Sequence, residues 1–243
     1  NKADLISAIS FFMIKKITNK VGDKKKIFYL PDFIDSSQFS NINNSKKTNP
    51  YYGELSLEDN KVIVMYSGTL NEKLASDTIV EVIKILSNQD HLLWIISGNG
   101  PKKKYLINKL SDFDNVRFYD FQPFSKLPFW LNIADIHLVP QKLSSVKYCM
   151  PSKLLGILAT GKPVIGIAPE DSDLGKILDK FGVRVSDEDP QEMSRRLLEL
   201  TKNKKLRSEL GQKGKDYIRK YHEKENVLNN ILIELKKIHS NND

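Results

Sequence analysis

Residues 61–98 read KVIVMYSGTLNEKLASDTIVEVIKILSNQDHLLWIISG, and this stretch decides the fold. It begins and ends with a short apolar run that is followed by Ser-Gly. Between the runs, Ile79, Val82, Ile83 and Leu86 recur at helical spacing. An apolar run without polar alternation indicates a strand that is buried on both faces, as in a parallel sheet. The stretch therefore predicts a strand–helix–strand unit with a right-handed crossover.

The same alternation continues to residue 185. Expected strands at 116–121, 136–139, 164–167 and 183–185 are separated by helical patterns at 102–111, 125–133, 152–160 and 173–180. We expect a doubly wound, Rossmann-like α/β domain with about six parallel strands. In such folds the ligand lies beyond the carboxyl ends of the strands, so the segments that follow each strand are the candidate site.

The segments outside this core have different patterns. Residues 4–20 have helical spacing and residues 27–30 resemble a short strand, whereas residues 36–60 are polar and typical of a connector without a core. After residue 185 only helices are expected, and their ranges are 190–201, 204–220 and 223–238.

Composition excludes several classes of protein. Of the 243 residues, 40% are hydrophobic and 28% are charged, and no apolar run approaches the roughly 20 residues of a membrane span. The net charge of +8 comes from 32 Lys and only 6 Arg, which is weak evidence for base recognition in nucleic acid. It fits either a solvated surface or attraction to anions, such as nucleotide phosphates or a membrane face. A single cysteine, Cys149, excludes an internal disulfide and a cysteine metal cluster.

Two glycine-containing turns follow the first two strands of the core. Gly68 permits a close backbone approach to a ligand, and Lys73 near the next helix can meet a phosphate, although a tight turn with a surface lysine explains both. Gly98 and Gly100 form only part of a dinucleotide fingerprint, because the third glycine and the acidic residue are missing.

Two later segments are further candidates. Ser152 is a suitable N-cap for the helix at 152–160, whose first amide groups and dipole can hold an anion, although plain capping is the common alternative. Residues 121–130, FQPFSKLPFW, are rich in aromatic rings that can wall a nucleobase, pack the domain edge or dip into a membrane.

Other active-site chemistries are not visible. The four histidines lie far apart without metal-binding spacing, and His137 falls inside an apolar strand, where a core role is expected. The sequence contains neither a nucleophile elbow nor a P-loop.

Five stretches together resemble the retaining family 4 glycosyltransferases, which have the two-domain GT-B fold. They are YSGTLNEK, IISGNGP, ADIHLVPQK, MPSKLLGILATGKPVIG and SDLGKIL, within residues 61–185. The likeness is greatest to bacterial surface-polysaccharide enzymes that transfer fucose or N-acetylfucosamine. The resemblance implies that residues 1–50 are the end of an amino-terminal domain and a hinge, residues 51–222 the donor-binding domain, and residues 223–243 a crossover helix. The chain then corresponds to the carboxyl-terminal half of such an enzyme.

The resemblance also implies roles for single residues. Those expected at the donor diphosphate are Gly68, Lys73, Ser152, Lys153 and Leu154. Those expected at the nucleobase or ribose are Gly98, Gln122, Pro123 and Tyr148. Asp173 is expected on the side of the donor sugar. No metal and no cofactor are expected, since the nucleotide-sugar is a substrate, and the chain offers no convincing general base.

Two departures from the family pattern concern the same site. Thr69 stands where the family has an arginine, and Tyr148 and Gly156 stand where most members have two glutamates. The second glutamate normally holds the ribose, so ribose recognition is open here, although the fucose-type branch often lacks it too.

The implied function is transfer of a sugar, with retention, from a UDP- or GDP-sugar to a glycan or a polyprenyl-diphosphate-linked acceptor. This would serve capsule, O-antigen or exopolysaccharide synthesis in the cytoplasm, with possible contact to the inner face of the membrane and no nucleic acid partner. The alternatives are a sugar-nucleotide epimerase of the same fold and a non-catalytic nucleotide-binding module. The sugar, the base, the acceptor and the oligomeric state are not fixed by the sequence.

Overall fold

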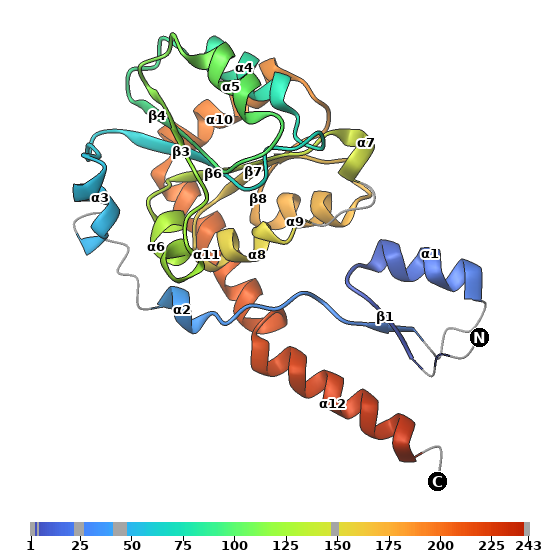
Figure 1. The fold of residues 1–243 in the computed structure, drawn as a ribbon. Coiled ribbons are helices and arrows are strands. Elements are labelled where there is room, and N and C mark those ends of the chain that lie inside the picture. Colours follow the sequence, from blue (N-terminus) through green and yellow to red (C-terminus); the bar gives the residue numbers. More distant parts are fainter. Residues whose placement is uncertain (1–2, 4, 22–26, 41–47, 147–150, 241–243) are drawn as a thin grey trace.

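A six-stranded parallel sheet forms the centre of the protein (Figure 1). The computed structural model describes residues 3, 5–21, 27–40, 48–146 and 151–240. Its strands lie in the order β5 (Val116–Tyr119), β4 (Leu92–Ser97), β3 (Val62–Ser67), β6 (Ile136–Pro140), β7 (Val164–Ile167) and β8 (Gly182–Val185). The chain order therefore reverses between β3 and β6, and this reversal is the topological switch point of a doubly wound fold.

Helices cover both faces of the sheet (Figure 1). One face packs against α4 (Ser76–Ile85), α5 (Lys103–Leu110) and α10 (Pro190–Lys202). The other packs against α3 (Pro50–Glu54), α6 (Leu127–Asn132), α8 (Lys153–Ala159), α9 (Asp173–Phe181) and α11 (Lys204–Tyr221). Alternate residues of β3 supply the two cores, with Ile63 and Met65 on one face and Val64 and Tyr66 on the other. The predicted α/β fold is confirmed.

The amino-terminal segment differs from the sequence prediction. Residues 4–20 are not one helix, because Ile6–Ala8 form strand β1, which pairs in parallel with β2 (Ile27–Tyr29). Helix α1 (Phe11–Val21) starts only after Ser10, whose hydroxyl accepts a hydrogen bond from the Met13 amide at 3.2 Å. The apolar spacing across a strand that runs into a helix imitated one longer helix.

The connector at residues 36–60 also differs from its prediction. It contains α2 (Ser37–Ser40) and α3, and Phe39, Tyr51 and Tyr52 are buried in the same core as α6 and α8. The Tyr51 ring meets the Trp130 ring edge-on at 5.0 Å. Asn49 caps α3 and donates a hydrogen bond to the Phe129 carbonyl at 2.8 Å. The connector is therefore part of the core at this edge of the domain.

Residues 29–39 are held by the junction of α11 and α12 (Lys224–Ser240). They are called the hinge segment below, after the role that the family resemblance implies. The Ile34 amide donates to the His222 carbonyl at 2.9 Å, and the Lys224 amide donates to the Ile34 carbonyl at 3.0 Å. The His222 side chain bonds to the Asp32 carbonyl at 2.7 Å and to the Tyr217 hydroxyl at 3.0 Å. These bonds fix the hinge segment across the carboxyl edge of the sheet.

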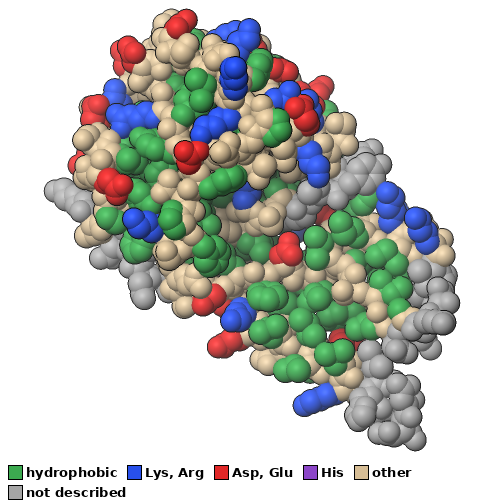
Figure 2. Space-filling view, in the orientation of Figure 1, with side chains coloured by type: hydrophobic (Ala, Val, Ile, Leu, Met, Phe, Trp, Pro, Cys, Tyr) green, Lys and Arg blue, Asp and Glu red, His purple; other side chains and the backbone are tan. Residues whose placement is uncertain are grey.

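Apolar side chains remain exposed outside the central domain. They gather over the β1–α1–β2 unit and α12 (Figure 2), and include Phe11 on α1 and Leu232, Ile233 and Leu235 on α12. None of the described helices is both long and apolar enough to cross a lipid bilayer.

His137 makes the stability of the domain depend on pH. It is fully buried in β6, and its Nε2 lies 3.0 Å from the Leu131 carbonyl. Burial lowers the pKa of His137 to about 3, with the positive charges of Lys162 and Lys153 adding to the effect. Below its ordinary pKa of about 6.5, the unfolded chain takes up a proton that the folded chain refuses, so stability falls as pH falls.

We expect the free energy of unfolding to fall between pH 6.5 and 4.5 by up to about 1.4 kcal/mol per pH unit from this group. Urea titrations followed by circular dichroism measure it. The variant His137→Leu should lose this part of the slope, whereas His91→Leu at the partly exposed start of β4 should keep it. Equal slopes in all three proteins would contradict this role of His137.

Candidate functional site

A cavity of about 1100 Å³ opens at the carboxyl ends of β3 and β6, at the topological switch point. Its walls come from the turn after β3, the exit of β6, the start of α8, the hinge segment and residues 121–131. The position agrees with the rule that ligands of open α/β sheets bind outside the carboxyl ends of the strands.

The first of two adjacent glycine turns forms one wall. The first glycine turn (residues 67–69) and the second (residues 97–100) follow neighbouring strands, and their backbones continue the sheet pairing. The Gly68 amide donates to the Ser97 carbonyl at 2.9 Å, and the Leu70 amide donates to the Asn99 carbonyl at 2.9 Å. A Cβ atom on Gly98 would lie 1.9 Å from the Gly68 carbonyl oxygen. Gly98 therefore supports the first turn from behind and does not line the cavity.

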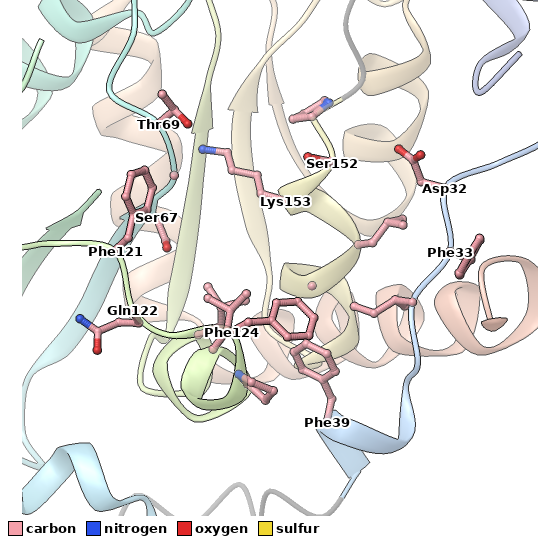
Figure 3. A pocket seen from close by; sticks show the side chains of 18 of the residues that line it. Asp32, Phe33, Phe39, Ser67, Thr69, Phe121, Gln122, Phe124, Ser152 and Lys153 are labelled. Carbon is pink, nitrogen blue, oxygen red and sulfur yellow. The ribbon is translucent and has the colours of Figure 1, made fainter. Parts of the chain in front are cut away.

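Lys153 reaches from the start of α8 toward the first glycine turn (Figure 3). Its Nζ lies 3.7 Å from the centre of the Tyr66 ring, a cation–π contact. A Cβ atom on Gly68 would lie 3.2 Å from Lys153 Cδ and 3.4 Å from its Nζ. The absence of a side chain at Gly68 therefore makes room for the Lys153 side chain. The Tyr66 hydroxyl donates to the Thr69 carbonyl at 2.7 Å and fixes the turn over the ring.

The ε-amine of Lys153 is poorly solvated where it stands. Desolvation by burial lowers its pKa from 10.5 to about 7. The side chain as a whole is only partly buried, since part of it faces the cavity. The position therefore destabilises the protonated form of the amine, and a ligand in the cavity can still reach it.

Lys73 and Ser152 also line the cavity, and both are exposed. The prediction that Ser152 caps α8 with its side chain is wrong, because Ser152 has helical backbone angles and its side chain makes no capping hydrogen bond. Leu154 points into the core, and its amide already donates to the Pro151 carbonyl at 2.9 Å. Of the three residues predicted at this helix start, only Ser152 and Lys153 thus line the cavity.

Aromatic side chains stand at another part of the wall. Phe121 and Phe124 line the cavity and remain 55% and 76% exposed, which is unusual for rings of this size. Gln122 lies between them in sequence, and its Oε1 accepts a hydrogen bond from the Tyr51 hydroxyl at 2.8 Å. Trp130 is buried in the core, so the aromatic segment divides between packing and the cavity.

Two further predicted residues, Pro123 and Asp173, lie outside the cavity lining. Pro123 is exposed, and its carbonyl accepts from the Lys126 amide at 2.9 Å outside the cavity lining. Asp173 accepts a hydrogen bond from the Phe12 amide at 3.2 Å, which ties α9 to the start of α1. Tyr148 lies outside the described residues, as does Cys149.

Sequence reasoning missed the contribution of the hinge segment. Asp32, Asp35 and Phe39 line the cavity from this segment (Figure 3). Nothing in the local pattern of residues 29–39 places them opposite α8, because the bonds to the α11–α12 junction that hold them come from residues almost 190 positions later. Among the described residues, no group of three or more metal-ligating side chains is present, and the absence of a required metal stays a prediction.

A family model described as glycosyl transferases group 1 matches residues 51–217. The match covers more than half of the chain, and the protein belongs to this family. The family region contains both glycine turns, the aromatic segment and the start of α8.

Among curated proteins, the chain is similar to WcaI of Escherichia coli (strain K12), whose name assigns it to colanic acid biosynthesis as a glycosyl transferase. The two are 27% identical over 184 residues, which cover 74% of this chain and 44% of WcaI. The chain therefore spans less than half the length of the curated relative that it matches.

Three solved structures share the fold. A glycosyltransferase from Rickettsia africae ESF-5 has a TM-score of 0.78 at 14% identity, covering 99% of this chain and 65% of that chain. Anabaena Alr3699/HepE, in complex with UDP and glucose, has a TM-score of 0.75 at 12% identity, covering 96% and 63%. WaaG, a glycosyltransferase involved in lipopolysaccharide biosynthesis, has a TM-score of 0.70 at 17% identity, covering 88% and 58%. The arrangement is the Rossmann-like α/β fold that is found in GT-B glycosyltransferase structures.

Replacing Gly98 tests the contact between the glycine turns. The variant Gly98→Ala places a methyl group against the Gly68 carbonyl at a φ of +142°, so we expect a loss of about 2–4 kcal/mol in the free energy of unfolding. Urea denaturation measures it. Gly53→Ala in α3, where a Cβ meets no atom within 4 Å, is the matched control and should leave stability unchanged or slightly higher. Equal stability of Gly98→Ala and wild type would contradict the contact.

Proposed function

We propose that the cavity binds the nucleotide part of a nucleotide-sugar donor, a UDP- or GDP-sugar. The observation that carries the proposal is that lysines and exposed aromatic rings from the family region line the same cavity. Lys73 and Lys153 with the first glycine turn suit a diphosphate, since they bring positive charge to a backbone that a ligand can approach closely. Phe121 and Phe124 suit a nucleobase, which stacks on aromatic faces.

The proposed reaction is transfer of a hexose-type sugar with retained configuration. Departure of the nucleoside diphosphate leaves negative charge on the oxygen that held the sugar, and the two lysines lie where they can stabilise that charge. This needs positioning and fixed positive charge more than proton transfer by the protein. The identity of a base stays open, because the transfer is proposed for the whole protein and the chain spans 44% of WcaI.

The proposed acceptor is a glycan or a lipid-linked glycan in the synthesis of a surface polysaccharide. The names of WcaI and WaaG, which refer to colanic acid and lipopolysaccharide biosynthesis, support this choice. UDP in the Anabaena structure supports a nucleotide diphosphate in this fold. Transfer of a fucose-type sugar, a cytoplasmic location and contact with the membrane face rest on the resemblance of the motifs and stay predictions.

Calorimetric titration of the protein with UDP, GDP and NAD tests the donor site. We expect UDP or GDP to bind and NAD not to bind, because the second glycine turn lacks the features of a dinucleotide site. Lys73→Ala should weaken binding about 3- to 10-fold, since an exposed charge–phosphate contact contributes about 1 kcal/mol. Lys104→Ala, on the exposed side of α5, is the control and should bind as the wild type. Binding of NAD alone, or of no nucleotide, would contradict the proposal.

Removal of one aromatic ring tests where the base lies. Phe124→Ala should weaken UDP or GDP binding roughly 5- to 100-fold, because stacking of a base contributes about 1–3 kcal/mol, and should leave pyrophosphate binding unchanged. Phe129→Ala removes a ring of the same size that lies outside the cavity lining, and should change neither. An equal loss for pyrophosphate and for the nucleotide would place the base elsewhere. A turnover assay on the whole protein then separates a transferase from an epimerase or a binding module.

A further inference from the structure

The ε-amine of Lys153 lies where the folded protein offers no paired negative charge to its protonated form. Its Nζ stands over the Tyr66 ring at 3.7 Å, and its side chain lies along Gly68. No hydrogen bond or ion pair joins its amine to any of the residues that the structure describes. A desolvated ammonium group needs a paired anion or loses its proton, so this amine is partly neutral near pH 7 in the free protein.

The charged and titratable groups around the amine come from five segments of the chain. Tyr66 of β3 is raised in pKa by burial and stays neutral, and His137 of β6 is neutral at all pH values above its lowered pKa of about 3. The turn after β3 adds Lys73, and Glu72 beside it pairs with Lys102 at 2.9 Å. The hinge segment adds Asp32 and Asp35, and the start of α12 adds Lys224, all on the cavity wall.

None of these groups compensates Lys153 in the way an anionic ligand would. The two carboxylates line the cavity from the hinge segment, and the Asp35 carboxylate is engaged by Ser37 and Gln38. The empty side of the amine faces the cavity beside the first glycine turn (Figure 3). An anion that enters there meets a buried amine at short range and in poorly solvated surroundings, where charge pairing is strong.

We propose that Lys153 takes up a proton when a nucleoside diphosphate binds, so that the ligand brings the counter-charge and the solvent brings the proton. The proposal rests on the donor site of the preceding section and adds a proton to its binding equilibrium. The amine gains one proton from the buffer, and the resulting ammonium group pairs with a phosphate oxygen beside Gly68. No covalent bond changes.

The sign of the effect follows from linkage. In the free protein the pKa of Lys153 is about 7, and in the complex the phosphate moves it back toward the ordinary value of about 10.4. Between these values the complex holds more protons than the free protein, so affinity falls as pH rises. At pH 7.0–8.5 the terminal phosphate of a nucleoside diphosphate has already lost its second proton, whose pKa is about 6, so the ligand itself contributes little.

The test is calorimetric titration with UDP and GDP at pH 7.0, 7.5, 8.0 and 8.5, each in two buffers with different ionisation enthalpies. We expect Kd to rise roughly 15-fold across this range and about three quarters of a proton to be taken up per ligand at pH 7.5. Lys153→Met should bind more weakly at pH 7.0, with a flat pH profile and no proton uptake. Lys153→Arg should bind with a flat profile too, because its charge does not titrate.

Lys73→Met is the matched control, because it also removes one positive charge from the cavity. It should weaken binding while keeping the slope and the proton uptake of the wild type. The proton count of the wild type needs no variant, so a folding defect in Lys153→Met leaves the test intact.

The outcomes separate this proposal from the donor site itself. Nucleotide binding without proton uptake, or uptake that persists in Lys153→Met, would overturn the role of Lys153 and leave the donor site standing. Failure of both nucleotides to bind at every pH would overturn the donor site and, with it, this inference.

Discussion

The site depends on one close backbone contact, between the two glycine turns that follow β3 and β4. The Gly98 backbone lies so near the Gly68 carbonyl that a methyl group cannot enter, and Gly100 meets Leu70 in the same way, with an added Cβ 2.4 Å from the Leu70 carbonyl. These contacts carry the sheet pairing two residues beyond the strands, where a loop would otherwise leave its amide groups unpaired. The first glycine turn is thereby fixed in front of Tyr66, and the narrow space above that ring is the space that Lys153 occupies. The packing of the two glycine turns against each other thus determines where the Lys153 amine lies.

The sequence predicted the sheet because its signal is local. The continuous apolar runs at 62–66 and 92–96, each followed by turn residues, need burial on both faces, and a parallel sheet between helices provides it. The strand β1 escaped prediction for the same reason, since Ile6 continues the apolar spacing of α1 and only its pairing with Ile27 makes it a strand. The buried connector tyrosines, Tyr51 and Tyr52, lie in a polar stretch, and their partner Trp130 is almost 80 residues away. Interactions between distant segments have no local pattern that could reveal them.

The predicted site residues also fall into two groups, those that line the cavity as local sequence predicts and those that distant contacts place elsewhere. Gly68, Lys73, Gln122, Ser152 and Lys153 line one cavity, as expected of residues at the exits of neighbouring parallel strands. Strand exits alone do not give side-chain direction: Leu154 follows Lys153 directly, yet it points into the core with no exposed surface. Asp173 starts a helix at the same edge but bonds to α1. The hinge residues could not be found at all, because their place depends on His222 and Lys224 at the far end of the chain.

The departure at Gly156 has a physical counterpart in the packing. Gly156 lines the cavity, and a Cβ atom at this position would lie 3.3 Å from Leu131 Cδ1 and 3.9 Å from Phe39 Cζ, so a side chain here would start against apolar groups. A glutamate placed there would bring its carboxylate toward two hydrophobic side chains or bend away into the cavity, at a cost in desolvation or in rotamer strain. Phe39 comes from the hinge segment and is itself buried at 5% exposure, so the apolar wall is built from two separate parts of the chain. A glutamate at this position would therefore require the contacts of Leu131 and Phe39 with α8 to be arranged differently.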